Sequence, residues 1–89
     1  MKLTRQNIAH KLIDYLFHRI TLAELVNWAE MSMMEADFED KDYETLRDII
    51  SRLGLADVKA FGISWEDIED FLHRLGYRVD LKITEVQAV

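Results

Sequence analysis

The chain has 89 residues, with no cysteine, no proline and only three glycines, and its 17 acidic and 11 basic residues give a formal net charge of −6. Hydrophobic residues make up 49% of the sequence, which is typical of a globular domain rather than of a disordered segment. Without cysteine the chain has no disulfide, thiolate nucleophile or cysteine ligand for zinc. We therefore expect one compact domain over residues 1–89, with one core and no deep substrate cavity.

Charge is unevenly distributed along the sequence. Residues 1–23 carry four basic side chains and one acidic one, whereas residues 24–44 carry eight carboxylates and one lysine, a net charge of −7. An acidic segment repels nucleic-acid phosphates and attracts basic groups. No apolar run approaches the roughly 18 residues of a membrane span, and no signal-peptide core follows Met1. We therefore expect a cytoplasmic protein with a basic protein partner and no binding to nucleic acid or membrane.

The first predicted helix begins after Thr4, a residue type that favours the N-cap position. Leu3 and Ile8 occupy the two positions of a hydrophobic staple around this cap. Its apolar residues recur at four-residue spacing: Ile8, Leu12, Leu16 and Ile20, with Ala9, Ile13 and Phe17 beside them.

The second predicted helix begins with the capping box from Thr21 to Glu24 and extends to about Ala36. Its core stripe is expected to be Leu22, Leu25, Val26, Ala29 and Met33. Trp28, Met31 and Met34 lie off that stripe, so the helix is apolar nearly all round. Such a helix is either central in the fold or presents a second apolar surface, and the sequence leaves both interpretations open.

Residues 35–42 break the helical period and are expected to form the longest loop. Asp40 or Asp42 then caps a third helix with the apolar stripe Leu46, Ile49, Ile50 and Leu53. Gly54 suits the position that follows this helix, because glycine enters the left-handed region freely, and Leu55 is expected to fold back on Ile50.

The fourth predicted helix begins at the capping box from Ser64 to Asp67 and ends at Gly76. Its buried residues are expected to be Ile68, Phe71, Leu72 and Leu75. After Gly76 the apolar period changes to two, with Tyr77, Val79, Leu81 and Ile83 on one face and Arg78, Asp80 and Lys82 on the other. This alternation indicates a half-buried strand over 77–83.

The partner of that strand stays open. Residues 55–61 also alternate, and parallel pairing of 55–61 with 77–83 would make the fold α+β. Alternatively, residues 55–61 form a short helical turn that ends at Gly62, and the strand pairs elsewhere, for example with its copy in a dimer. The predicted fold class is therefore mainly α: a compact four-helix domain with a short C-terminal β element.

Neither a metal site nor a catalytic motif is predicted. His10, Asp14 and His18 align on one helix face, but this face lies opposite the apolar stripe, and the two imidazoles are separated by roughly 12 Å of helix rise. An EF-hand that starts at Asp40 would place Thr45 where glycine is required. Nucleophile motifs and glycine-rich phosphate loops are missing from the sequence. We therefore expect no enzyme activity, no metal and no cofactor.

The acidic segment and the apolar side chains of the second helix together suggest a protein-binding surface. Trp28, Met31 and Met34 would make the desolvated contact, because tryptophan and methionine are common at binding surfaces. The acidic side chains would steer a basic partner: Glu30, Glu35, Asp37, Glu39 and Asp40. The alternative function is a structural homodimer with no separate ligand.

The segment from Gly62 to Tyr77, together with the early Thr-Leu-x-Glu-Leu pattern of Thr21 to Leu25, resembles small helical bacterial proteins. Some of these short acidic proteins resemble bacterial immunity proteins, which implies inhibition of a basic toxin partner. The matching residues are caps and core residues, and no toxin-contacting motif of the colicin-immunity type is present. The resemblance therefore assigns no functional residue to this chain.

Overall fold

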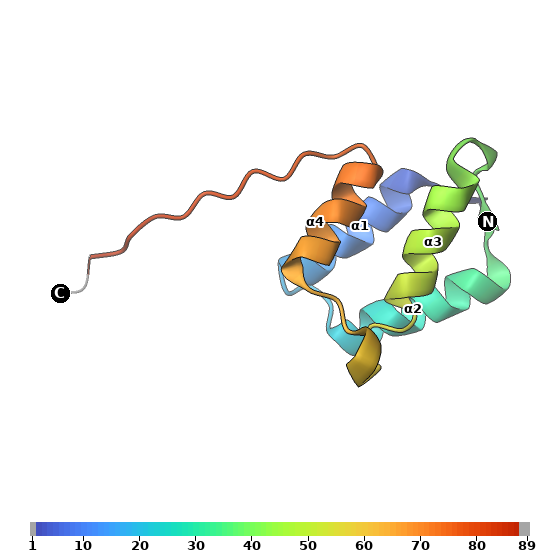
Figure 1. Ribbon diagram of the computed structural model, residues 1–89, viewed down its shortest axis with the longest axis horizontal. Coiled ribbons are helices and arrows are strands. Elements are labelled where there is room, and N and C mark those ends of the chain that lie inside the picture. Colours follow the sequence, from blue (N-terminus) through green and yellow to red (C-terminus); the bar gives the residue numbers. More distant parts are fainter. Residues whose placement is uncertain (1, 88–89) are drawn as a thin grey trace.

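A computed structural model describes residues 2–87, which form four α-helices, a two-strand parallel ladder and two 3₁₀ turns (Figure 1). The elements in chain order are β1 (Lys2–Leu3), α1 (Arg5–Leu16), α2 (Leu22–Glu35), β2 (Asp37–Phe38), η1 (Asp40–Asp42), α3 (Tyr43–Leu53), η2 (Lys59–Phe61) and α4 (Trp65–Arg74). The prediction of a mainly α fold with four helices is confirmed. No helix among these residues is both long and apolar enough to cross a membrane.

Side-chain caps define where three of the helices begin. Thr21 caps α2 by accepting a hydrogen bond from the backbone N–H of Glu24 at 3.1 Å, and the Glu24 carboxylate accepts one from the Thr21 N–H at 3.0 Å. Ser64 and Asp67 form the same reciprocal pair at α4. Both predicted capping boxes are confirmed, and the predicted Thr4 cap of α1 is completed by Asn7. These bonds satisfy backbone donors that a helix start otherwise leaves without a partner.

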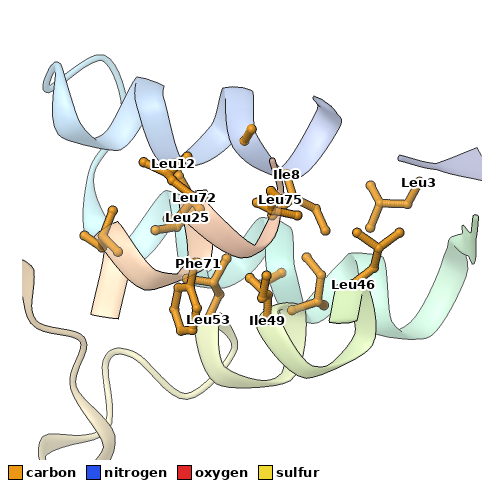
Figure 2. Packing of buried hydrophobic residues seen from close by; sticks show 14 residues of the cluster. Leu3, Ile8, Leu12, Leu25, Leu46, Ile49, Leu53, Phe71, Leu72 and Leu75 are labelled. Atoms are coloured by element: carbon orange, nitrogen blue, oxygen red, sulfur yellow. The ribbon is translucent and has the colours of Figure 1, made fainter. Parts of the chain in front are cut away.

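The core lies between the helices, where α2 packs against α3 and α1 contacts α2, α3 and α4. The predicted stripes of α3 and α4 are buried as expected (Figure 2). Leu3 of β1 lies at one end of the cluster, on the side of Leu46, and is fully buried. The core therefore includes a residue from the segment before α1 as well as the inner faces of the helices.

The acidic connection between α2 and α3 is not the open loop expected for residues 35–42. It contains β2, which pairs in parallel with β1, and then the single turn η1. The N–H of Glu39 donates to the Leu3 carbonyl at 3.0 Å, and the rings of Phe38 and Tyr43 meet edge to face. A two-residue strand shows no alternating pattern, so its existence depends on the partner that the tertiary fold brings alongside.

The predicted short β element is present, but it does not lie at the C-terminal end of the described residues. Residues 77–87 run extended without a ladder partner among the described residues, and the sheet lies instead near the start of the chain. Residues 55–61 form turns and η2 before Gly62, so the α+β pairing of 55–61 with 77–83 is wrong and the helical-turn alternative is confirmed. Alternation identifies an extended backbone, but a ladder also requires an edge within reach.

Gly54 and Gly76, which follow α3 and α4, differ in backbone conformation. Gly76 has φ +92°, the left-handed geometry expected after α4, and it allows the N–H of Tyr77 to donate to the Leu72 carbonyl. Gly54 has φ −65° and continues right-handed, so the expected left-handed end of α3 is wrong. Because the chain goes on in turns there, Ala56 becomes buried, and Leu55 is exposed instead of folding back on Ile50.

Candidate protein-binding surface

The inner face of α2 is set by Leu25, Val26, Ala29 and Ser32, all of which are buried. Ser32 and Met33 follow Ala29 at three and four residues, so helical spacing places both near the buried stripe, but only Ser32 is buried. The expectation that Met33 belongs to the core stripe is therefore wrong, because its side chain is exposed. Its sulfur lies 3.8 Å from the Ser51 hydroxyl of α3.

Trp28 occupies the boundary between core and surface. Its side chain is half-buried and packs against the core cluster, and the Lys11 ammonium lies 5.6 Å from the ring centroid. Met31 and Met34, by contrast, are 49% and 84% exposed. Residues 28, 31 and 34 follow each other at three-residue spacing, so they form a slanting row from the α1 side of α2 to its outer surface. The row thus joins a fixed aromatic ring to two accessible thioethers.

A hollow of about 340 Å³ lies along this row and is lined by Trp28, Met31, Ser32, Glu35 and Ala36; we call it the α2 hollow. The amide of Asn27 lies 3.8 Å from the Met31 sulfur. A smaller hollow of about 200 Å³ shares Trp28 and is otherwise lined by residues of β1 and α1. The Trp28 ring therefore borders two depressions.

The five acidic residues of the predicted binding surface lie in four different places. Glu35 lines the α2 hollow, whereas Glu30 lies on the other flank of α2, beside Gly54. Asp37 is exposed on β2 and Glu39 is half-buried beyond it. Asp40 lines a separate hollow around η1. The structure thus brings Trp28, Met31 and Glu35 together, leaves Met34 on the adjoining outer surface, and does not gather all five carboxylates at one point.

The histidine alignment on the first helix does not continue to His18. Helix α1 ends at Leu16, and His18 has φ +60°, outside the helical geometry that would align it with His10. Asp14 instead forms an ion pair with Arg19 at 3.1 Å. Within residues 2–87, no group of three or more potential metal-ligating side chains lies close together.

A second apolar depression was not predicted. It has a volume of about 370 Å³ and lies where the end of α1, the start of α4 and the segment after Gly76 meet; we call it the α1–α4 hollow. It is lined by Ile13, Leu16, Phe17, Trp65, Leu72 and residues 77–81. Phe17, which the sequence placed beside the core, is 68% exposed because it follows the last residue of α1. The sequence predicted that the first helix continues past Phe17 to Ile20, so it gave no signal for this hollow.

Asp67 has a lowered pKa that its position in a helix cap explains without any catalytic role. The Ser64 N–H donates to its carboxylate at 2.9 Å, and this hydrogen bond, helped by the Ser64 hydroxyl and by Arg52, lowers the pKa of Asp67 below its usual 3.8. The Arg52 guanidinium lies 3.6 Å from the Asp67 carboxylate. The arrangement is that of a helix cap, so we assign Asp67 a structural role.

No known protein family, curated protein or solved structure matches this chain.

Proposed function

We propose that the protein is a non-catalytic binding module whose α2 hollow, with the adjoining Met34, receives a basic protein partner. The observation that carries this proposal is the row of Trp28, Met31 and Met34, whose exposure increases from a half-buried ring to a thioether that is 84% exposed. Side chains of this kind that face solvent around a hollow lose unfavourable hydration when a partner covers them.

The rigid part of the surface favours affinity. Trp28 is held by the core cluster and by Lys11, so ordering it on binding costs little conformational entropy. Met31 and Met34 provide the adaptable part, because an unbranched thioether repacks readily against different shapes. A fixed ring beside flexible thioethers is a combination suited to forming an energetic hot spot.

Charge favours a basic partner over an acidic one. Glu35 lines the α2 hollow, Asp37 follows in β2, and the segment 24–44 carries a net charge of −7. Such a field accelerates encounter with a positively charged surface and repels nucleic acid. The specific form of the proposal is a cytoplasmic bacterial inhibitor that neutralises a basic protein, as the resemblance to immunity proteins suggests.

A structural homodimer without another ligand is the second candidate. It is favoured by a different observation: residues 81–87 are extended, exposed and without a backbone partner among the described residues. The two candidates use different surfaces, so they are separable by substitution.

Affinity capture from a lysate of the source cells tests the first candidate with three baits. The baits are the unaltered chain, the double variant Met31→Ala/Met34→Ala, and the matched control Leu55→Ala/Val58→Ala, which truncates two exposed apolar residues away from the α2 hollow. We expect a basic protein to bind the first and third baits and to be lost from the second. Capture of the same proteins by all three baits would contradict the proposal.

Binding kinetics with the captured protein then separate the two roles. The substitutions Glu35→Gln and Asp37→Asn, which neutralise two carboxylates, should slow association and flatten the dependence of the association rate on salt. Met31→Ala should mainly speed dissociation and cost about 1–3 kcal/mol of binding free energy. Equal melting temperatures of all variants provide the control for folding.

A further inference from the structure

The segment after α4 is extended as far as residue 87, and it has no ladder partner among the described residues. The N–H of Tyr77 bonds to the Leu72 carbonyl at 2.9 Å, and beyond it residues 78–87 form no backbone hydrogen bond within the described part of the chain. Figure 1 shows this segment running away from the four helices. Tyr77 and Val79 pack against the core, whereas Leu81 and Ile83, on the same face of the strand, are 66% and 84% exposed. Free backbone groups beside exposed apolar side chains form a template for strand pairing.

We infer that two copies of the chain pair through residues 77–85 as antiparallel strands, with Leu81 opposite Leu81 of the second copy. Side chains alternate between faces, so only shifts that set the odd-numbered residues, among them Val79, Leu81 and Ile83, opposite odd-numbered residues of the second copy are admissible. Charge then distinguishes among these shifts, because residues 78, 80 and 82 on the other face are arginine, aspartate and lysine.

Centring the pairing on Leu81 places Asp80 opposite Lys82 of the second copy, and does so twice by symmetry. Centring it on Asp80 sets two aspartates opposite each other, and centring it on Lys82 does the same with two lysines. Parallel pairing in register also opposes like charges, which destabilises a sheet. Centring on Val79 opposes Arg78 and Asp80 favourably, but it leaves Lys82 and Ile83 outside the pairing.

The Leu81-centred register also covers the apolar residues near the α1–α4 hollow. It places Ile83 of the second copy opposite Val79, which lines this hollow together with Phe17 and Trp65. Phe17 and Ile83 are among the more exposed apolar side chains of the chain, so their contact would remove both from water. Because each end of the ribbon packs on a helical body, the ribbon is not an isolated two-stranded hairpin, which would be marginally stable.

The shape of the molecule agrees with this pairing. The radius of gyration is 14.3 Å, whereas a compact chain of this length has about 12 Å, because the segment after Gly76 extends from the body (Figure 1). Antiparallel pairing of two such segments sets the helical bodies at opposite ends of the ribbon. The α2 hollow does not contribute to the ribbon, so the inference is independent of the proposed binding of a basic partner and gives a specific form to the homodimer candidate.

Charge reversal tests the register by sedimentation equilibrium. We expect the unaltered chain to dimerise reversibly, and Asp80→Lys or Lys82→Asp to weaken the dimer on the order of tenfold, since each makes both cross-strand pairs repulsive. The double variant Asp80→Lys/Lys82→Asp should recover the dimer. A mixture of the two single variants should form heterodimers, because lysines of one then face aspartates of the other. A monomeric unaltered chain, or a double variant no tighter than the singles, would overturn the inference.

Cysteine substitution gives an independent readout, because the natural chain has no cysteine. Residues directly opposite each other in antiparallel strands lie about 4.5–5.5 Å apart at their Cα atoms, within the range of a disulfide. Leu81→Cys should therefore form a disulfide-linked dimer rapidly on mild oxidation. Val79→Cys and Ile83→Cys, whose own copies lie several residues away in this register, should crosslink slowly. Faster crosslinking at position 79 or 83 than at 81, or equal rates at all three, would contradict the register.

Discussion

Two extended segments flank the helices, and within residues 2–87 only the first of them is part of a sheet. In β1, Leu3 is fully buried, and its carbonyl accepts a hydrogen bond from the Glu39 N–H. After α4, the chain is equally extended and has a longer alternating pattern, yet Leu81 and Ile83 remain exposed. An alternating pattern of apolar residues therefore indicates an extended backbone, whereas pairing in a sheet depends on which strand edge lies within reach.

The helix next to each extended segment sets the direction of that segment, and the direction decides whether another strand lies alongside it. β1 directly precedes the Thr4 cap of α1, so its direction is set by a helix that packs against the core. It therefore lies alongside the chain that leaves α2, where β2 is formed. The second segment leaves α4 through the left-handed turn at Gly76, and Figure 1 shows it leading away from the body.

Truncating one leucine in each segment gives the largest expected contrast. Leu3→Ala should lower the free energy of unfolding by about 2–5 kcal/mol, because it empties a fully buried site. Leu81→Ala should change it by less than about 0.5 kcal/mol at concentrations where the chain is monomeric. Chemical denaturation measures both. Equal effects of the two substitutions would contradict the difference between the segments.

Shortening the second segment in two steps should locate where its attachment to the core ends. Ending the chain after Asp80 should leave the stability of the monomer nearly unchanged, since Leu81 and Ile83 are exposed. Ending it after Gly76 also removes the half-buried Tyr77 and Val79 and should cost about 1–3 kcal/mol. Thermal melting of the two truncated chains measures the difference. A large loss from the shorter deletion would show that residues 81–87 contribute to the core.

Alanine at the two glycines examines the turn from which the second segment departs. Gly76→Ala should cost about 1–2 kcal/mol, because φ is +92° and the new Cβ would lie 3.2 Å from the Arg5 guanidinium. Gly54→Ala should be neutral or should stabilise by about 0.4–1 kcal/mol, because its backbone is right-handed and the nearest atoms are at ordinary contact distances. Opposite signs in urea denaturation would confirm the distinction, and equal losses would contradict it.

The smallest expected effect concerns pH at the other end of α4. The folded-state pKa of Asp67 is lowered below 3.8 by the Ser64 hydrogen bonds and Arg52. Its ionised form therefore stabilises the fold above pH 3.8, and this contribution is lost as the pH falls through the lowered folded-state pKa. Asp67→Asn keeps an oxygen acceptor for the Ser64 N–H and removes the charge. Stability of the variant, measured by denaturation from pH 2 to 7, should fall less steeply in acid; identical profiles would contradict the assignment.

Local sequence signals predict the helical part of this fold. The caps at Thr4, Thr21 and Ser64 and the apolar stripes of α3 and α4 are local signals, because a capping bond and a helical repeat involve residues close in the chain. The sequence also identified Trp28, Met31 and Met34 as apolar residues beyond the core stripe of α2, but it did not show which of them solvent reaches.

The tertiary structure alone decided the rest. The pairing of β1 with β2 joins residues 2 and 37, so no local pattern predicts it. The burial of Ser32 rather than Met33 on the inner face of α2 depends on where α3 lies. The α1–α4 hollow exists because the end of α1 meets the start of α4. Burial is a property of neighbours distant in sequence. For that reason only the folded chain shows which side chains of α2 are exposed, and that residues 77–87 have no ladder partner among the described residues.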